Sequence, residues 1–246
     1  MKKEPSASEK TSGITRRKSS NVVNQKITRR VHLLFYGGAL KVGDNSAFEF
    51  SAKNVRKDYI KHFPNDSVIF KFMSSAKTMV DIINNQKKGH VASLDLFFHG
   101  SKWGVYMYKG SSMNKTLSVD DVSNNNLNAG LYGSFTAGLT STDTSEEKRT
   151  IDDIDFSVFI DSGAVIEIHG CESGGDLIFI DSISKNLSEN IPNGYVIGHT
   201  TKAYPNINDT KVNEEQDYRH GERAIWKNGR VIKKTTKQGW LNLKGL

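Results

Sequence analysis

The chain has 246 residues, of which 36% are hydrophobic and 25% are charged. This is the composition of a globular protein with a sizeable core in one or two domains. No apolar run approaches the roughly 20 residues that a membrane-spanning helix needs, and the basic N-terminus has no apolar core after it, so no cleavable signal peptide is predicted. The single cysteine excludes an internal disulfide and favours a reducing compartment. We expect a protein that is cytoplasmic, or exported without a cleavable signal peptide.

The net charge of +7 comes from one end of the chain. Residues 1–30 hold nine of the 34 Lys and Arg residues and two of the 27 Asp and Glu residues, so 25 of each sign remain for the rest. The body is therefore neutral, and we expect it to bind no nucleic acid. Residues 1–28 are rich in Ser, Lys and Asn, which predicts a disordered basic tail. The tail either docks to a partner or secretion apparatus, or is a solvated leader.

From residue 31 onward, strand-like runs alternate with helix-like stretches. The first half contains expected strands at Val31–Tyr36, Ser67–Phe72 and Leu94–Phe98, a helix at Phe48–His62, and a second helix that Ser74 and Ser75 cap and that ends by Gly89. Such alternation predicts an α/β fold, a three-layer sandwich in which helices flank a mostly parallel sheet.

The alternation is interrupted and then resumes. We expect an edge hairpin at Trp103–Lys109, a loop-rich stretch at Asn114–Arg149, a short helix from Thr150 toward Ile160, a strand at Val165–Ile168, a helix at Asp176–Glu189, a strand at Tyr195–Gly198 and a hairpin around Asn228-Gly229. The Asn-Gly pair is typical of a two-residue hairpin turn. We interpret residues 29–246 as one domain with a C-terminal β-hairpin extension.

Two of these strands end in residues that can do chemistry. One run ends in Phe98-His99-Gly100, and the other ends in His169-Gly170-Cys171. The carboxyl ends of parallel strands share one edge of a sheet, where ligands bind in such folds. A histidine and a thiol at that edge are the minimum for a cysteine nucleophile with its proton carrier. On position alone, each residue is more often structural.

The element order and these two endings resemble the caspase-hemoglobinase fold of clan CD cysteine peptidases. That group includes caspases, gingipains, clostripain, separase and the self-cleaving protease domains of bacterial toxins, and the Gly-Cys ending is most similar to the toxin type. The resemblance covers roughly residues 31–201. It implies that His99 is the proton carrier and Cys171 the nucleophile of a dyad. The caspase signature Gln-Ala-Cys-x-Gly is absent, so aspartate specificity is not implied.

The expected activity is that of a cysteine endopeptidase, in a bacterial effector or a self-processing toxin domain, with a protein or peptide as substrate. Backbone N–H groups near Gly100 and Cys171 are expected to hold the oxyanion, and a helix N-terminus close behind Cys171 is expected to favour the thiolate. Substrate contacts are expected from Glu172, Asp176, Thr200 and Tyr204. Acidic candidates for a basic substrate residue are Asp161, Glu172, Asp176 and Asp209.

Three alternatives stay open at this point. The first is an inactive binding module of the same fold, and the second is a hydrolase of a non-protein amide or thioester. The third is a metal hydrolase that uses His99, His169 and His199, although their spacing matches no compact metal motif, and packing or hydrogen bonding is the favoured role for His169 and His199. We expect no metal and no cofactor. Phosphate-loop and Gly-x-Ser-x-Gly motifs are missing from the sequence.

Overall fold

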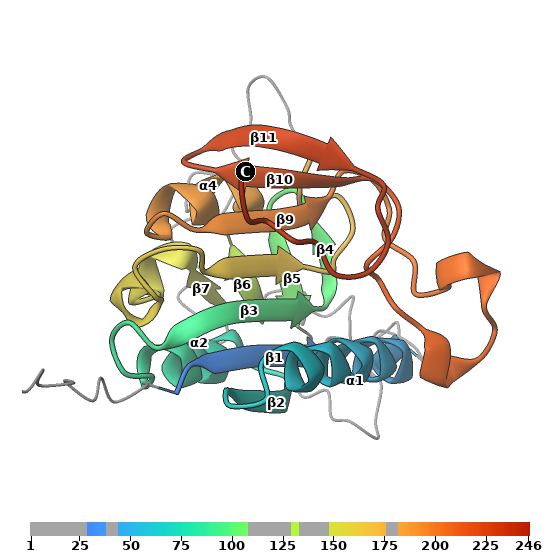
Figure 1. The fold of residues 1–246 in the computed structure, drawn as a ribbon, viewed down its shortest axis with the longest axis horizontal. Coiled ribbons are helices and arrows are strands. Elements are labelled where there is room, and N and C mark those ends of the chain that lie inside the picture. Colours follow the sequence, from blue (N-terminus) through green and yellow to red (C-terminus); the bar gives the residue numbers. More distant parts are fainter. Residues whose placement is uncertain (1–28, 38–43, 108–128, 133–147, 176–181) are drawn as a thin grey trace, which may run out of the picture.

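The computed structural model describes residues 29–37, 44–107, 129–132, 148–175 and 182–246 (Figure 1). The predicted basic tail, the residue Asp176 and most of the loop-rich stretch at 114–149 lie outside these ranges. Among the described residues, no helix combines the length and apolar character needed to span a membrane.

A seven-stranded sheet forms the centre of the described part (Figure 1). Its strands are β1 (Val31–Gly37), β2 (Ser67–Met73), β3 (Val91–Phe97), β8 (Val165–Ile168), β9 (Tyr195–His199), β10 (Arg223–Lys227) and β11 (Arg230–Thr235), in the order β11-β10-β9-β8-β3-β1-β2. The five neighbouring strands β2, β1, β3, β8 and β9 are parallel. At one edge, β10 pairs antiparallel with β9, and β11 pairs antiparallel with β10. The predicted α/β class with a mostly parallel sheet is therefore confirmed.

Helices cover both faces of this sheet. On one face, Leu33 and Phe35 of β1 pack in a cluster with α2 (Ala76–Asn84) and α4 (Ile183–Asn190). On the other face, Leu34 and Tyr36 pack in a second cluster with α1 (Asp44–His62). Opposite orientation of neighbouring side chains is the period of a β-strand. The side chain of Ser75 caps α2 by accepting a hydrogen bond from the backbone of Thr78, as the sequence predicts.

A second, four-stranded sheet follows β3, and the sequence did not predict it. It consists of β4 (His99–Ser101), β5 (Gly104–Met107), β6 (Ala129–Tyr132) and β7 (Lys148–Thr150). The predicted edge hairpin was misplaced, because the actual hairpin joins β4 to β5 and belongs to this second sheet. Consequently His99 lies where the chain passes from one sheet into the other.

Two predicted helices differ from the structure. The stretch from Thr150 toward Ile160 forms two 3-10 turns, at Ile151–Asp153 and Phe156–Val158, instead of one helix. Asp153 and Asp155 cap them by accepting hydrogen bonds from the backbone of Thr150 and Ser157. The helix predicted at Asp176–Glu189 is described only from Ile183, where Ser182 caps it.

The C-terminal hairpin was predicted correctly. Asn228 and Gly229 connect β10 and β11 and both have positive φ angles, of 49° and 73°. Only a type I′ turn places two successive residues in that region, and Asn-Gly is the pair that tolerates it.

Candidate functional site

The chain segments that follow β3 and β8 touch through two glycines. A Cβ atom on Gly100 would lie 3.3 Å from the Cα of Gly170, and one on Gly170 would lie 3.2 Å from the Cα of Gly100. β3 and β8 are neighbouring parallel strands with Ser93 opposite Val165. His99 directly precedes Gly100, and Cys171 directly follows Gly170, so these backbone contacts bring both chain segments to one point.

His99 and Cys171 lie on the face of the sheet that α1 covers. The ring of His99 meets Phe48 of α1 edge-on, with 5.2 Å between ring centroids. Cys171 contacts Ala203, which packs against the same apolar cluster as Phe48 and Tyr218. Both His99 and Cys171 are only half-buried. Side chains on opposite faces would have excluded a dyad, whereas this arrangement permits one.

The sulfur of Cys171 is held by the connection between β9 and β10. The backbone N–H of Ala203 donates to Sγ across 3.4 Å. The backbone N–H of Glu172 donates to the Thr201 carbonyl across 2.8 Å, and Glu172 has a positive φ of 55°. The thiol in turn donates to the carbonyl of Ala203 at 3.8 Å, so the backbone of this one residue offers the sulfur both a donor and an acceptor.

The expected helix directly behind Cys171 is not part of the described structure. Residues 171–174 form turns, and α4, the first helix described after them, begins at Ile183. The expectation that a helix N-terminus immediately after Cys171 favours the thiolate therefore has no support from the described residues.

The residues expected to bind substrate are spread along two loops. Glu172 is exposed beside Cys171, and Tyr204 is 58% exposed one residue after Ala203. Thr200 is half-buried, and its hydroxyl donates to the carboxylate of Glu222. The carbonyl of Tyr204 accepts from the ring of His220. Asp161 and Asp209 are exposed, and Asp161 lies just before β8, at the opposite end of that strand from Cys171.

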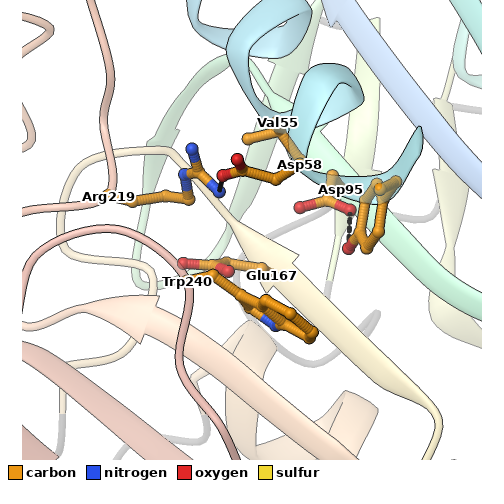
Figure 2. Close-up of a pocket in the computed structure, with 7 residues that line it drawn as sticks. Val55, Asp58, Asp95, Glu167, Arg219 and Trp240 are labelled. Atoms are coloured by element: carbon orange, nitrogen blue, oxygen red, sulfur yellow. Dashed lines mark hydrogen bonds and ion pairs between the residues drawn. The ribbon is translucent and has the colours of Figure 1, made fainter. Parts of the chain in front are cut away.

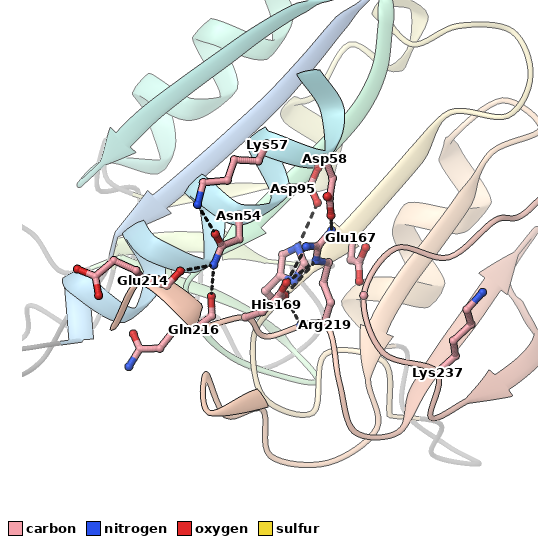
Figure 3. A network of polar contacts seen from close by, with 12 residues as sticks. Asn54, Lys57, Asp58, Asp95, Glu167, His169, Glu214, Gln216, Arg219 and Lys237 are labelled. Carbon is pink, nitrogen blue, oxygen red and sulfur yellow. Dashed lines mark hydrogen bonds and ion pairs between the residues drawn. The ribbon is translucent and has the colours of Figure 1, made fainter. Parts of the chain in front are cut away.

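The loop that carries Ala203 is anchored to α1. Asn54 donates from its side chain to the carbonyls of Glu214 and Gln216, at 3.0 and 2.9 Å. The guanidinium of Arg219 pairs with Asp58 of α1 at 2.8 Å and with Asp217 at 2.6 Å (Figure 3). These contacts fix the loop that borders the sulfur. None of these anchor residues was identified from the sequence.

Burial and ion pairing shift two groups of this anchor. Burial by itself opposes ionisation of Arg219, but its bonds to Asp217 outweigh that effect and raise the pKa of Arg219 above its ordinary value. Burial would raise the pKa of Asp217, yet the hydrogen bonds from Arg219 hold it below the usual range. Both groups are therefore charged at neutral pH.

A group of buried polar residues lies on the face of the sheet that α1 covers. Asp95, Glu167 and His169 bring their ligand-type atoms within 4.8 Å of one another, and they are the one such group of three among the described residues. Oδ2 of Asp95 accepts from Tyr59, and Oε1 of Glu167 accepts from Arg223 at 2.6 Å. These oxygens have partners inside the protein, whereas the buried Nδ1 of His169 has no hydrogen-bond partner in the described structure.

The alternative of a metal site formed by His99, His169 and His199 finds no support in the described residues. His99 and His199 belong to no group of three ligand atoms within 4.8 Å in the described part. His169 instead bonds to Asp95. Asp95 was not identified from the sequence, although it is the single charged residue of the buried strand β3. That was the available signal, because a buried charge requires a partner.

The small cavity beside this group cannot hold a substrate. It measures about 10 Å³ and is lined by residues of α1, β3, β8 and the loop after β9 (Figure 2). Asp58 and Arg219 meet on one side of it, and Trp240 closes another. Burial beside Asp95 raises the pKa of Tyr59, so the Tyr59 hydroxyl stays protonated and donates to Asp95.

A larger cavity of about 740 Å³ lies elsewhere on this face. His32, Ser93, Val165 and Tyr195, at or near the beginnings of strands, line it together with the C-terminal segment. His99 and Cys171 are not among its lining residues. The larger cavity and the pair of His99 and Cys171 therefore lie at different places in the protein.

The buried His199 is expected to make the folded protein less stable in acid. Burial, reinforced by the nearby His169, Arg223 and His220, lowers its pKa to about 3. The unfolded chain takes up this proton near pH 6.5, whereas the folded chain stays neutral at His199 until about pH 3. Stability therefore falls as the pH drops below 6.5, by about 2 kcal/mol from this group at pH 5.

Urea unfolding at pH 7 and pH 5 measures this effect. The His199→Asn variant is expected to lose most of that pH dependence, while His62→Gln, at an exposed position, keeps it. Equal pH dependence in wild type and His199→Asn would show that His199 is not the buried neutral group described.

Comparison of the sequence with models of known protein families and with curated proteins finds no match in either.

Proposed function

We propose that this chain is a cysteine endopeptidase of the caspase-hemoglobinase type, with Cys171 as nucleophile and His99 as proton carrier. The observation that carries the proposal is the contact of Gly100 with Gly170, which brings the two strand ends together on one face of the sheet. The element order behind the resemblance is also present, since β1-α1-β2-α2-β3 leads to His99-Gly100, and β8 leads to Gly170-Cys171 before α4 and β9.

The proposed reaction is acyl transfer from a peptide to Cys171 and then to water. The thiolate attacks the peptide carbonyl carbon, and backbone N–H groups near Gly100 and Cys171 stabilise the oxyanion. His99 gives a proton to the leaving amine as the C–N bond breaks. It then takes a proton from the water that releases the acyl group and restores the thiolate.

Substrate contacts are proposed on the loops beside the sulfur. Glu172 directly follows Cys171, Tyr204 directly follows Ala203, and both side chains are exposed, so they are accessible to a bound peptide. Glu172 is the nearest of the acidic candidates in sequence to the nucleophile, and it would favour a basic residue in the substrate. Asp161 precedes β8, at the end of that strand opposite Cys171, so it is not part of the proposed substrate site.

The experiment is hydrolysis of a peptide library, with self-cleavage followed in parallel. Cys171→Ala is expected to lower the rate by at least about 10³-fold, and His99→Ala by about 10² to 10⁴-fold. His62→Ala, on the exposed end of α1, serves as the control for loss of an imidazole and keeps wild-type activity.

The outcomes separate the remaining alternatives. Activity that survives Cys171→Ala would exclude this nucleophile. Absence of peptide hydrolysis, together with hydrolysis of a non-protein amide that still requires Cys171, would assign a different acyl substrate. A wild-type protein that hydrolyses neither, and whose Cys171 alkylates like an ordinary thiol, would be an inactive module of this fold.

A further inference from the structure

Two buried polar side chains join the strands that lead to the proposed dyad. Asp95 precedes His99 by four residues in β3, and His169 precedes Cys171 by two residues after β8. Nε2 of His169 lies 3.1 Å from Oδ1 of Asp95, and the two side chains are 0% and 1% exposed (Figure 3). Tyr59 of α1 donates to Asp95, and the ring of His169 stacks on Phe97 of the apolar cluster that packs against α1. The bond therefore lies on the same face of the sheet as His99, whose ring meets Phe48 of α1.

Main-chain pairing between these strands stops short of the dyad. The register of β3 with β8 ends at Leu96 opposite Ile168. In the described residues, the last main-chain hydrogen bond of the pair runs from the His169 N–H to the Leu96 carbonyl, at 2.9 Å. Asp95 lies within the paired stretch, opposite Glu167, and its bond to His169 joins β3 to the first residue after β8. Beyond these residues, the contact of Gly100 with Gly170 relates the two chain segments.

The imidazole of His169 is held in one orientation. Its ring stacks on Phe97 with 3.9 Å between centroids and 6° between planes. The carboxylate partner is itself fixed from α1, because Tyr59 donates to Oδ2 of Asp95 at 2.7 Å. A hydrogen-bonded carboxylate and a stacked ring together leave His169 little freedom to rotate.

Packing alone does not explain this pair. The residues that alternate with it on the opposite face, Leu94 and Leu96 in β3 and Ile166 and Ile168 in β8, are aliphatic and fully buried. Aliphatic side chains in place of a buried ionic pair are often neutral or stabilising. The adjoining cavity of about 10 Å³ is too small for a ligand, and the carboxylate oxygens already have partners.

We propose that Asp95 and His169 are positioning residues, which set the separation of His99 and Cys171 by tying together the strands that carry them. This inference rests on the proposed function. Displacement of a reacting group by about 1 Å costs on the order of 10²-fold in rate, and His169 lies two residues before Cys171 in the chain. Loss of the bond therefore lets the imidazole and the thiol drift apart.

The test measures the reactivity of Cys171 with iodoacetamide at pH 6.5 and pH 9, by mass spectrometry. An ordinary thiol is mostly protonated at pH 6.5 and loses about 100-fold in rate between these values, whereas a thiol paired with an imidazole loses much less. His99→Ala is expected to lower the rate at pH 6.5 by about 10-fold. His169→Leu, which abolishes the bond to Asp95, is expected to do nearly the same.

Two variants separate positioning from folding. His169→Gln retains a side-chain N–H for Asp95 and is expected to stay within about 3-fold of wild type at pH 6.5. Ile168→Val shortens a buried side chain on the opposite face of β8 and lowers thermal stability without changing the rate ratio. With a peptide substrate, His169→Leu is expected to lower kcat by about 10²-fold and to change KM by less than about 3-fold.

The results distinguish failure of the inference from failure of the proposed function. If Cys171 of the wild type reacts like an ordinary thiol and His99→Ala does not change its alkylation rate, both the proposed dyad and the positioning role are overturned. If His99→Ala lowers the rate while a folded His169→Leu does not, the dyad stands and the positioning role is overturned. Asp95→Ala, which also abolishes the bond to His169, serves as the second variant if His169→Leu does not fold, with the same expected loss and the same overturning result.

Discussion

Gly174→Ala is expected to destabilise the protein by about 3 kcal/mol and to lower its thermal midpoint by roughly 10 °C. A Cβ atom at Gly174 would lie 2.2 Å from the carbonyl oxygen of Gly198 and 2.9 Å from its Cα. These are main-chain atoms of β9, and they cannot rotate aside as a side chain could. The backbone would have to separate, which would break the hydrogen bond from Gly174 to His199 at 2.8 Å.

Gly175→Ala is the matched control for this prediction. Its Cβ would meet the carbonyl of Glu172 at 3.2 Å, which a shift of a few tenths of an ångström relieves, so a cost of less than about 1 kcal/mol is expected. Chemical and thermal unfolding of both variants measures the difference. If Gly174→Ala melts within about 2 °C of wild type, the close approach of the turn after Cys171 to β9 is incorrect.

Arg223→Met is expected to cost about 3 to 5 kcal/mol. Arg223 is 0% exposed, and its Nη1 donates to Oε1 of Glu167 at 2.6 Å. Its Nη2 donates to the carbonyls of Lys237 and Gly239. Removal of the guanidinium would leave a buried carboxylate without a counter-charge and would release the C-terminal segment from β10.

The double variant Glu167→Met/Arg223→Met identifies the cause of that loss. Removing both charges is expected to recover most of the stability, since an apolar pair replaces the ion pair without leaving a charge unpaired. Arg230→Met, at an exposed position of β11, is expected to stay within about 0.5 kcal/mol of wild type. Urea unfolding gives all three values. A double variant no more stable than Arg223→Met would show that the carbonyl contacts, and not the unpaired Glu167, dominate.

Local patterns predicted most of the parallel sheet. The strands at Val31, Ser67, Val165 and Tyr195 begin where expected, because buried parallel strands read as short apolar runs between turn residues. The Asn228-Gly229 turn was equally clear. Prediction failed after His99, where residues at and beyond the end of a buried strand pair with β5 in a second sheet. No local property of three residues reveals which of two sheets they will join.

The candidate site was likewise predicted only in part from the sequence. Chain order placed His99 and Cys171 at neighbouring strand ends, and the structure adds the glycine contact and the shared face. The residues around them were beyond prediction, because their partners are distant in sequence. Arg219 meets Asp58 across 161 positions.

The sequence by itself determined the α/β alternation, the helix caps, the hairpin turn and the two strand ends that carry a histidine and the single thiol. These depend on side-chain periodicity and on backbone preferences within a few residues. Only the tertiary structure decided that Asp95 bonds His169, that Arg223 balances Glu167, and that Ala203 borders the sulfur of Cys171. The physical reason is that a buried charge or thiol acquires its character from the atoms packed around it, and here folding brings those atoms from strands, helices and loops far apart in the chain.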